Sequence, residues 1–227
     1  ENGADQILSI HISPRLSNIA NIAQLAAEEL DGNRVHVIDS GNLTMSTGLL
    51  VEKAASLIAA GLPIAEIKSE LKETSERTYS FSRLKTLEYL RRSGRVSDLK
   101  NGLASLLDIK PIMKMHSGVP EMEMVRTMRH ANQRVVELVS SIERIERIGV
   151  VHANARSETE ALLEQLKPLL PADIEILVNE VTPVIGVHVG PGAICFCIIA
   201  ADKISPDQHG LVGGIVKKMR GFTHEEG

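Results

Sequence analysis

Apolar residues in the first eighty positions occur in short runs and, between these runs, at helical spacing. The runs predict strands at residues 6–12 and 35–38. The helical spacing predicts helices that begin near residue 19, at residue 47 and at residue 63, the last two running to about residues 60 and 76. Strands that alternate with helices of these lengths indicate a parallel sheet with crossover helices.

The second half of the chain shows a similar pattern. A hairpin is predicted at residues 109–127, and strands at 147–152, 174–181 and 193–200 with helices between them. We therefore expect an α/β protein with mostly parallel sheets and two α/β domains, residues 1–80 and residues 81–227. Because the first strand begins with no lead-in, we also expect that an upstream section is missing.

The stretch between the two halves predicts two short helices joined by a turn. Ser82 can cap the first helix, and Gly94 fits its end, where a left-handed residue closes the last turn. Leucines mark one face of this helix: Leu84, Leu87 and Leu90. Arg95 then falls in the turn before a second helix at about residues 99–107. It is either an anion contact, as a rigid guanidinium donor, or a surface arginine in a connector.

Methionines alternate with polar residues in both strands of the predicted hairpin, so that four thioethers share one surface: Met113, Met115, Met122 and Met124. Methionine adapts to irregular contents, and this stripe fits either the wall of an apolar pocket or ordinary core. Lys114 lies between two of these methionines. It is expected to pair across the hairpin with Glu121 or Glu123 in a modest surface contact.

Two further segments carry candidate anion contacts. Ser17 stands where the first strand gives way to its helix, at the edge where open α/β sheets bind ligands, and it is equally suited to be a plain helix cap. Residues 186–192 have three glycines and a proline, which predicts a tight loop with His188 in its middle. This histidine could donate a hydrogen bond to an anion or have a structural role. The known glycine-rich phosphate motifs are absent.

Composition narrows the function classes. The net charge is −4 and the chain has no Trp, two Tyr and three Phe, so neither a basic patch nor a stacking platform for nucleic acid is expected. Cys195 and Cys197 are two residues apart in an apolar strand, where a disulfide between them would distort the backbone. They indicate buried thiols of a reducing compartment, with no metal site, and hence a cytoplasmic protein. No apolar run approaches a membrane span and no signal peptide opens the sequence.

Six motifs then follow in an order that resembles the DegV family, between Gln6 and about Ala200. They are Ile-Ser-Pro-Arg-Leu-Ser, Val-Ile-Asp-Ser, Ser-Thr-Gly-Leu, Thr-Leu-Glu-Tyr-Leu-Arg-Arg-Ser-Gly-Arg-Val-Ser, Leu-Leu-Asp-Ile-Lys-Pro-Ile and Val-His-Val-Gly-Pro-Gly. This resemblance implies a bacterial two-domain α/β protein that encloses a long-chain fatty acid. Some members of the family present the carboxylate of the acid to a separate fatty acid kinase.

The resemblance also implies roles for particular residues. Ser17, Arg95 and His188 match family positions near the carboxylate, and Gly190 and Gly192 match the glycines of the loop beside it. The sequence departs from the family after Ser17, where Asn-Ile-Ala replaces the usual Gly-Thr-Tyr. The first strand-helix section of the family is also absent. The implied protein is no enzyme and needs no cofactor; its partners are the fatty acid, a kinase protein and, transiently, a membrane.

Two other hypotheses remain open. A small hydrolase of lipids or esters would use Ser17 with His188, although the sequence lacks a Gly-x-Ser-x-Gly nucleophile turn. A lipid-sensing regulatory protein would have the same pocket and no kinase partner.

Overall fold

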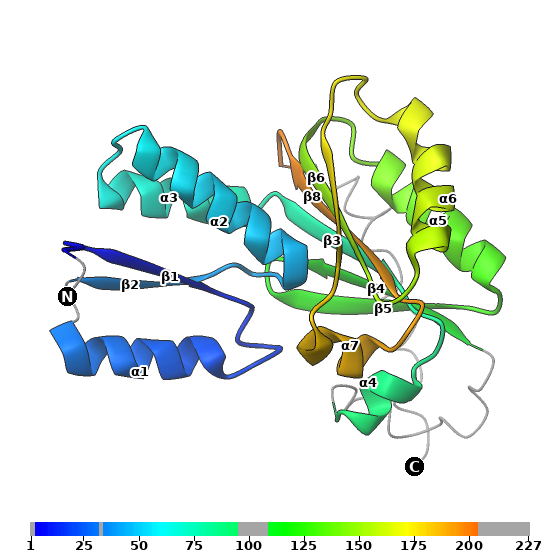
Figure 1. Ribbon diagram of the computed structural model, residues 1–227, viewed down its shortest axis with the longest axis horizontal. Helices are drawn as coiled ribbons and strands as arrows, with labels where there is room; N and C mark the ends of the chain where they lie inside the picture. The colour runs from blue at the N-terminus through cyan, green and yellow to red at the C-terminus, as the bar shows by residue number, and fades with distance from the viewer. Residues whose placement is uncertain (1–2, 32–33, 95–108, 204–227) are drawn as a thin grey trace, which may run out of the picture.

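The computed structural model describes residues 3–31, 34–94 and 109–203. Its first unit is a two-stranded parallel sheet of β1 (Ile7–His11) and β2 (Val35–Asp39). Helix α1 (Ile19–Asp31) lies on one side of this sheet, and α2 (Thr44–Ala59) and α3 (Ile64–Ser75) lie on the other (Figure 1). The strands and helices predicted for this region are therefore present.

The second unit is a six-stranded sheet in the order β5-β4-β3-β8-β6-β7. Its strands are β3 (Thr78–Arg83), β4 (Lys110–His116), β5 (Val119–Val125), β6 (Ile145–His152), β7 (Ile176–Glu180) and β8 (Ile194–Ala200). Helices α5 (Met128–Ser140) and α6 (Arg156–Leu166), the latter extended by the 3₁₀ turn η3 (Lys167–Leu169), cover one face (Figure 1). Helix α2 packs against the other face.

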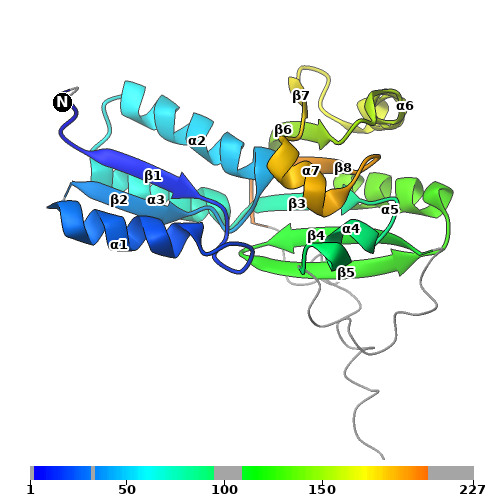
Figure 2. The same cartoon turned by 60° about the horizontal axis from the view of Figure 1, so that its bottom comes forward.

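Two short helices complete the described fold. Helix α4 (Glu88–Arg92) follows β3, and α7 (Pro183–Val189) precedes β8. The two helices pack together at the end of the sheet where β3 and β6 finish and β8 begins (Figure 2). This end of the sheet holds the candidate site.

The α/β class is confirmed, but among the described strands parallel pairing is confined to β1 with β2 and β6 with β7. The other pairs of the six-stranded sheet are antiparallel. One reason is local, because the short turn between β4 and β5 allows only an antiparallel hairpin. The other is tertiary: after α7 the chain inserts β8 between β3 and β6 instead of adding it beside β7. The expected hairpin at residues 109–127 is present as β4 and β5.

The boundary expected after residue 80 falls inside β3. Because α2 of the first unit packs against strands of both sheets, the division into two domains stays a prediction.

The prediction of a helix that starts at Ser82 is wrong, because Ser82 lies in β3 and the helix begins at Glu88. Tyr79 and Phe81 alternate with serines in a period of two, which is the pattern of a strand. Ser82 was predicted to cap a helix, yet all six residues of β3 are buried. Gly94 does adopt the predicted left-handed conformation after the helix, with φ of 70°.

The two faces of the sheet have different packing partners. Side chains of β3 and β8 that point to α5 and α6, such as Phe81 and Phe196, belong to the main hydrophobic core. Side chains on the opposite face, such as Cys195 and Cys197, pack with Leu49 of α2. Because both faces of β3 and β8 are buried, these strands form the centre of the molecule.

A buried polar network joins the loop before α2 to β3. Asn42 Oδ1 accepts a hydrogen bond of 2.7 Å from the Ser80 hydroxyl, and Asn42 Nδ2 donates to the carbonyl of Thr78 at 3.3 Å. The Ser46 and Ser80 hydroxyls are also bonded, at 2.7 Å. These bonds satisfy polar groups that are otherwise costly to bury, and so they fix the start of α2 against the sheet.

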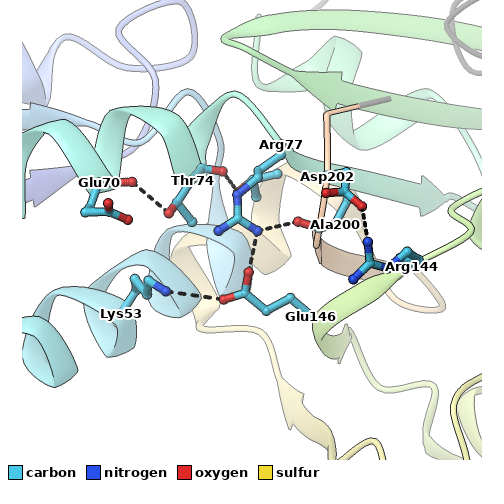
Figure 3. Close-up of polar contacts among 9 residues, drawn as sticks. Lys53, Glu70, Thr74, Arg77, Arg144, Glu146, Ala200 and Asp202 are labelled. Carbon is cyan, nitrogen blue, oxygen red and sulfur yellow. Dashed lines mark hydrogen bonds and ion pairs between the residues drawn. The ribbon is translucent and has the colours of Figure 1, made fainter. Parts of the chain in front are cut away.

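A charged network joins α2 to the far end of the same sheet (Figure 3). Arg77 donates to both Glu146 and the carbonyl of Ala200, and Lys53 of α2 lies 3.4 Å from Glu146. Burial raises the pKa of the Glu146 carboxyl, but the hydrogen bond and charge of Arg77 outweigh this effect and the pKa is lowered. The carboxylate is therefore stabilised in its charged form between α2 and β6.

The prediction that residues 186–192 form one tight loop is wrong. Residues 183–189 form α7, which includes Gly186 and His188, and the chain leaves the helix only at Gly190. Pro183 occupies the first turn, where its missing N–H does no harm. The loop prediction failed because three glycines suggested turns, although Gly186 has helical neighbours.

Gly190 is required for two reasons. Its φ is 73°, and a Cβ added there would lie 2.2 Å from the ring of Tyr89. Gly192 is similar, since a Cβ would meet Lys85 at 2.3 Å. By contrast, a Cβ on Gly186 would meet nothing within 4 Å. The glycines at 190 and 192 thus allow α4 and the turn before it to pack closely on the α7–β8 connection.

We predict opposite effects for two alanine substitutions at this connection. Gly190→Ala should lower the free energy of unfolding by about 2–4 kcal/mol, through the left-handed backbone and the overlap with Tyr89. Gly186→Ala should raise it by about 0.5–1 kcal/mol, because alanine is the better helix former. Urea unfolding followed by circular dichroism measures both. Equal effects of the two substitutions would contradict the packing described here.

Candidate functional site

A pocket of about 320 Å³ of non-atom space, its opening included, lies between α7, the loop before α2 and one face of the six-stranded sheet. Most of its lining is apolar: Leu43, Leu84, Met113, Val151, Val181, Ile185, Val189, Ala193 and Ile194. The polar lining residues are Thr44, Ser82 and Cys195. A mostly apolar lining with a few polar residues is the composition typical of a site for an aliphatic ligand.

The methionine stripe contributes to this pocket in part. Met113 lines it, and its cross-strand neighbour Met122 packs against the leucine cluster beside it. Met115 is core, packed with Leu43. The pocket hypothesis is therefore confirmed for Met113, while Met115 follows the alternative.

Lys114 points to the opposite face of the hairpin and forms the predicted pairs. Its ammonium lies 3.1 Å from Glu121 and 2.9 Å from Glu123, but the contact is buried rather than superficial, since Lys114 is only 4% exposed. Arg134 of α5 also binds Glu123, with two hydrogen bonds of 2.9 and 3.1 Å. Burial raises the pKa of Glu123, and these cations lower it further than burial raises it. This cluster attaches α5 to the hairpin, away from the pocket.

Ser17 lies in the turn before α1 and is partly buried. Its Oγ accepts a hydrogen bond of 3.4 Å from the amide of Ile19, the first residue of α1, and so ties this turn to the start of the helix. The preceding residue, Leu16, packs with Leu43 and Met113, which line the pocket. Ser17 therefore stands beside the pocket without lining it.

His188 lies on α7, one turn after Ile185 and next to Val189, both of which line the pocket. Its Nδ1 is buried and has no hydrogen-bond partner among the described residues. A buried nitrogen without a partner is uncommon, and it leaves one position on this helix open to a polar ligand group.

The structure does not bring Ser17 and His188 into contact. In the ranges described, the polar partners of Ser17 are the Ile19 amide and the Ser13 carbonyl, and no hydrogen bond joins it to His188. The hydrolase hypothesis, which needs the two side chains to act together, therefore has no support from the geometry. Arg95 lies outside the described residues.

Arg83 is a buried cation that the sequence analysis did not single out. It is 1% exposed, its Nη1 donates to the Gly192 carbonyl at 2.7 Å, and its Nε has no partner among the described residues. Burial lowers the pKa of its guanidinium, and the charge of Glu158 opposes that effect. The sequence signal for Arg83 is its position in phase with Tyr79 and Phe81, which becomes visible once residues 78–83 are recognised as a strand. It fixes the Gly192 end of the loop that follows α7.

Within the described ranges, no group of three or more His, Cys, Asp or Glu side chains is placed to hold a metal ion. Among the helices in those ranges, none combines the length and the apolar character that a membrane span requires.

Comparison with known proteins gives consistent results. A family model described as "Uncharacterised protein, DegV family" matches residues 1–201. The DegV domain-containing protein SCO2569 of Streptomyces coelicolor is 32% identical over 201 residues, which cover 86% of this chain and 70% of the relative.

Two solved structures share the fold. A DegV family protein from Thermus thermophilus, whose structure is described under "fatty acid binding", has 31% identity and a TM-score of 0.78, covering 87% of this chain and 72% of that one. DegV from Bacillus subtilis, described as a fatty acid binding protein, has 31% identity and a TM-score of 0.75, covering 86% and 70%. With its motifs, its fold and these relatives in agreement, the chain belongs to the DegV family.

Proposed function

We propose that this chain binds a long-chain fatty acid, with the acyl chain in the pocket beneath α7 and the carboxylate held at its polar edge. The observation that carries the proposal is the apolar pocket itself, lined in part by Ile185 and Val189 of α7. His188 on the same helix does not line the pocket, but its buried Nδ1 has no partner among the described residues. The fatty-acid-binding relatives from Thermus thermophilus and Bacillus subtilis support it.

The energetics favour the acyl chain as the main source of affinity. Each buried CH₂ contributes roughly 0.8 kcal/mol, so that a few methylenes outweigh a hydrogen bond. In this proposal the head-group contacts are Ser17, Arg95 and His188, with the backbone at Gly190 and Gly192. They select a carboxylate through charge-assisted hydrogen bonds.

The proposed protein is a carrier and not an enzyme, and it presents the carboxylate to a separate kinase for acyl phosphate formation. We place it in the cytoplasm, which is consistent with two free thiols in its core. A membrane would be met only transiently, during uptake of the acid.

The first test is occupancy of the pocket. Protein expressed in bacteria should carry a co-purifying fatty acid, detected by solvent extraction and mass spectrometry. Ile185→Trp should lower fatty acid affinity about tenfold, because the indole displaces about two methylenes at roughly 0.8 kcal/mol each. Since the chain has no tryptophan, the new fluorophore also reports binding.

Val184→Trp on the same helix is the matched control, since Val184 is 71% exposed and does not line the pocket. Its affinity should stay within about twofold of the parent value. Equal losses in both variants, or a protein that neither carries nor binds fatty acid, would refute the assignment of the pocket.

The second test concerns the head group. His188→Ala, Ser17→Ala and Arg95→Ala should each weaken binding of a fatty acid by about tenfold or more, since hydrogen bonds to charged groups contribute about 1.5–3 kcal/mol. The affinity of the same variants for the corresponding fatty alcohol should fall much less. Calorimetry with both ligands measures the difference, with His130→Ala on the exposed face of α5 as control. A loss that is the same for acid and alcohol would remove these residues from the head-group site.

The third test separates a carrier from a sensor. The chain alone with ATP should form no acyl phosphate, while addition of a bacterial fatty acid kinase protein should yield it from the bound acid. Trapping of the product with hydroxylamine measures the reaction. Acyl phosphate made by the chain alone would show an enzyme, and no product with the kinase would favour the sensor.

A further inference from the structure

The pocket wall contains two sulfur atoms in contact. Cys195 and Cys197 are two residues apart on β8, so that both side chains leave the same face of the sheet. Both are free thiols, and their Sγ atoms are 3.7 Å apart. Cys195 lines the pocket, while Cys197 is fully buried behind it. A ligand in the pocket therefore reaches the pair through Cys195.

The surroundings of the pair are polar for so buried a position. Thr44, which begins α2 and also lines the pocket, has its Oγ1 3.7 Å from Cys197 Sγ. Burial raises the pKa of the Cys197 thiol, but hydrogen bonds from Cys195, Ser46 and Thr44 outweigh burial and lower it to about 7. The hydrogen bond with Cys197, together with burial, raises the pKa of Cys195. The two sulfurs thus titrate as a pair that holds one proton above neutral pH.

We propose that Cys195 and Cys197 reduce hydroperoxides that an acyl chain carries into the pocket. The inference rests on the proposed function, because the bound chain is what brings the peroxide beside Cys195. A thiolate in contact with a second thiol is the arrangement of a redox-active cysteine with its resolving partner.

The chemistry balances in two steps. The Cys195 thiol first passes its proton to the neighbouring Cys197 thiolate, 3.7 Å away. The Cys195 thiolate formed in this way attacks the terminal oxygen of the hydroperoxide and the O–O bond breaks, which gives a sulfenic acid on Cys195 and an alkoxide. The alkoxide takes the proton back from Cys197 and becomes the alcohol. The Cys197 thiolate then attacks the sulfenic sulfur, and hydroxide leaves and takes up a proton to become water. Overall two thiols and one hydroperoxide give a disulfide, an alcohol and water; the thiols are oxidised and the peroxide is reduced.

A disulfide here is reachable but strains the strand. Two residues along a strand separate Cα atoms by about 6.6 Å, near the upper end of the roughly 4.4–6.8 Å that disulfides span. Closing the gap between the sulfurs bends β8 locally. Because strained disulfides are the readily reduced ones, an ordinary thiol reductant should restore the pair.

The test compares two peroxides on the full chain, reduced and freed of reductant. Linoleic acid hydroperoxide should convert both thiols to an intramolecular disulfide, seen by intact mass and peptide mapping. Its rate should exceed that of hydrogen peroxide by about tenfold or more, because binding raises its concentration beside Cys195. Excess palmitate, which competes for the pocket, should slow the reaction with the acyl hydroperoxide.

Variants assign the roles. Cys197→Ser should stop at the sulfenic acid on Cys195, which dimedone captures, and Cys195→Ser should leave Cys197 unmodified by the acyl hydroperoxide. Ile185→Trp, which fills the pocket and changes neither thiol, should slow the reaction with the acyl hydroperoxide more than the reaction with hydrogen peroxide. Equal rates for the two peroxides, or undiminished reaction of Cys195→Ser, would overturn the proposal.

Fatty acid affinity, measured on the same reduced sample, distinguishes a failure of the peroxide chemistry from a failure of fatty acid binding. If the chain binds palmitate while the acyl hydroperoxide leaves both thiols free, the peroxide chemistry fails and the proposed function stands. If the chain binds no fatty acid, both fail.

Discussion

The site depends on the antiparallel insertion of β8 between β3 and β6. This pairing places Ser82 opposite Cys195 and Arg83 opposite Ile194 at one end of the sheet. The two chain segments that leave this end, α4 after β3 and α7 before β8, are thereby forced to pack on one another. Leu84 from the first segment and Val189 from the second then meet over the sheet, and the pocket lies between them.

Because successive side chains of a strand point to opposite faces, the two faces of the same strands have different roles. On β8, Phe196 and Ile198 fill the core under α5 and α6, while Cys195 and Cys197 turn to α2 and the pocket. A protein can therefore vary the chemistry of the pocket face without opening its main core, because successive side chains never share a face. The thiol pair lies on this second face, with Cys195 in the lining of the pocket.

The first unit contributes the pocket's other border through a small number of satisfied polar contacts. Asn42 and Ser46 bind Ser80 on β3, and Lys53 and Arg77 meet at Glu146 at the other end of α2. Buried hydrogen bonds of this kind add little net stability, yet leaving one unmade is costly, so they define a single position for α2. That position sets where Leu43 and Thr44 meet the pocket.

Local periodicity in the sequence was enough to predict the α/β class, most helices, the hairpin and the same-face thiols, and six motifs spread between Gln6 and about Ala200 were enough to predict the family. The sequence did not reveal β3, α7 or the buried Arg83, because serines and glycines locally favour turns, and burial under other segments overrode that preference. Only the tertiary structure placed Leu43, Ser82, Met113, Ile185 and Cys195 around one cavity. Their neighbourhood is set by which strands pair in the sheet, and this is decided by burial summed over the whole chain rather than by any local pattern.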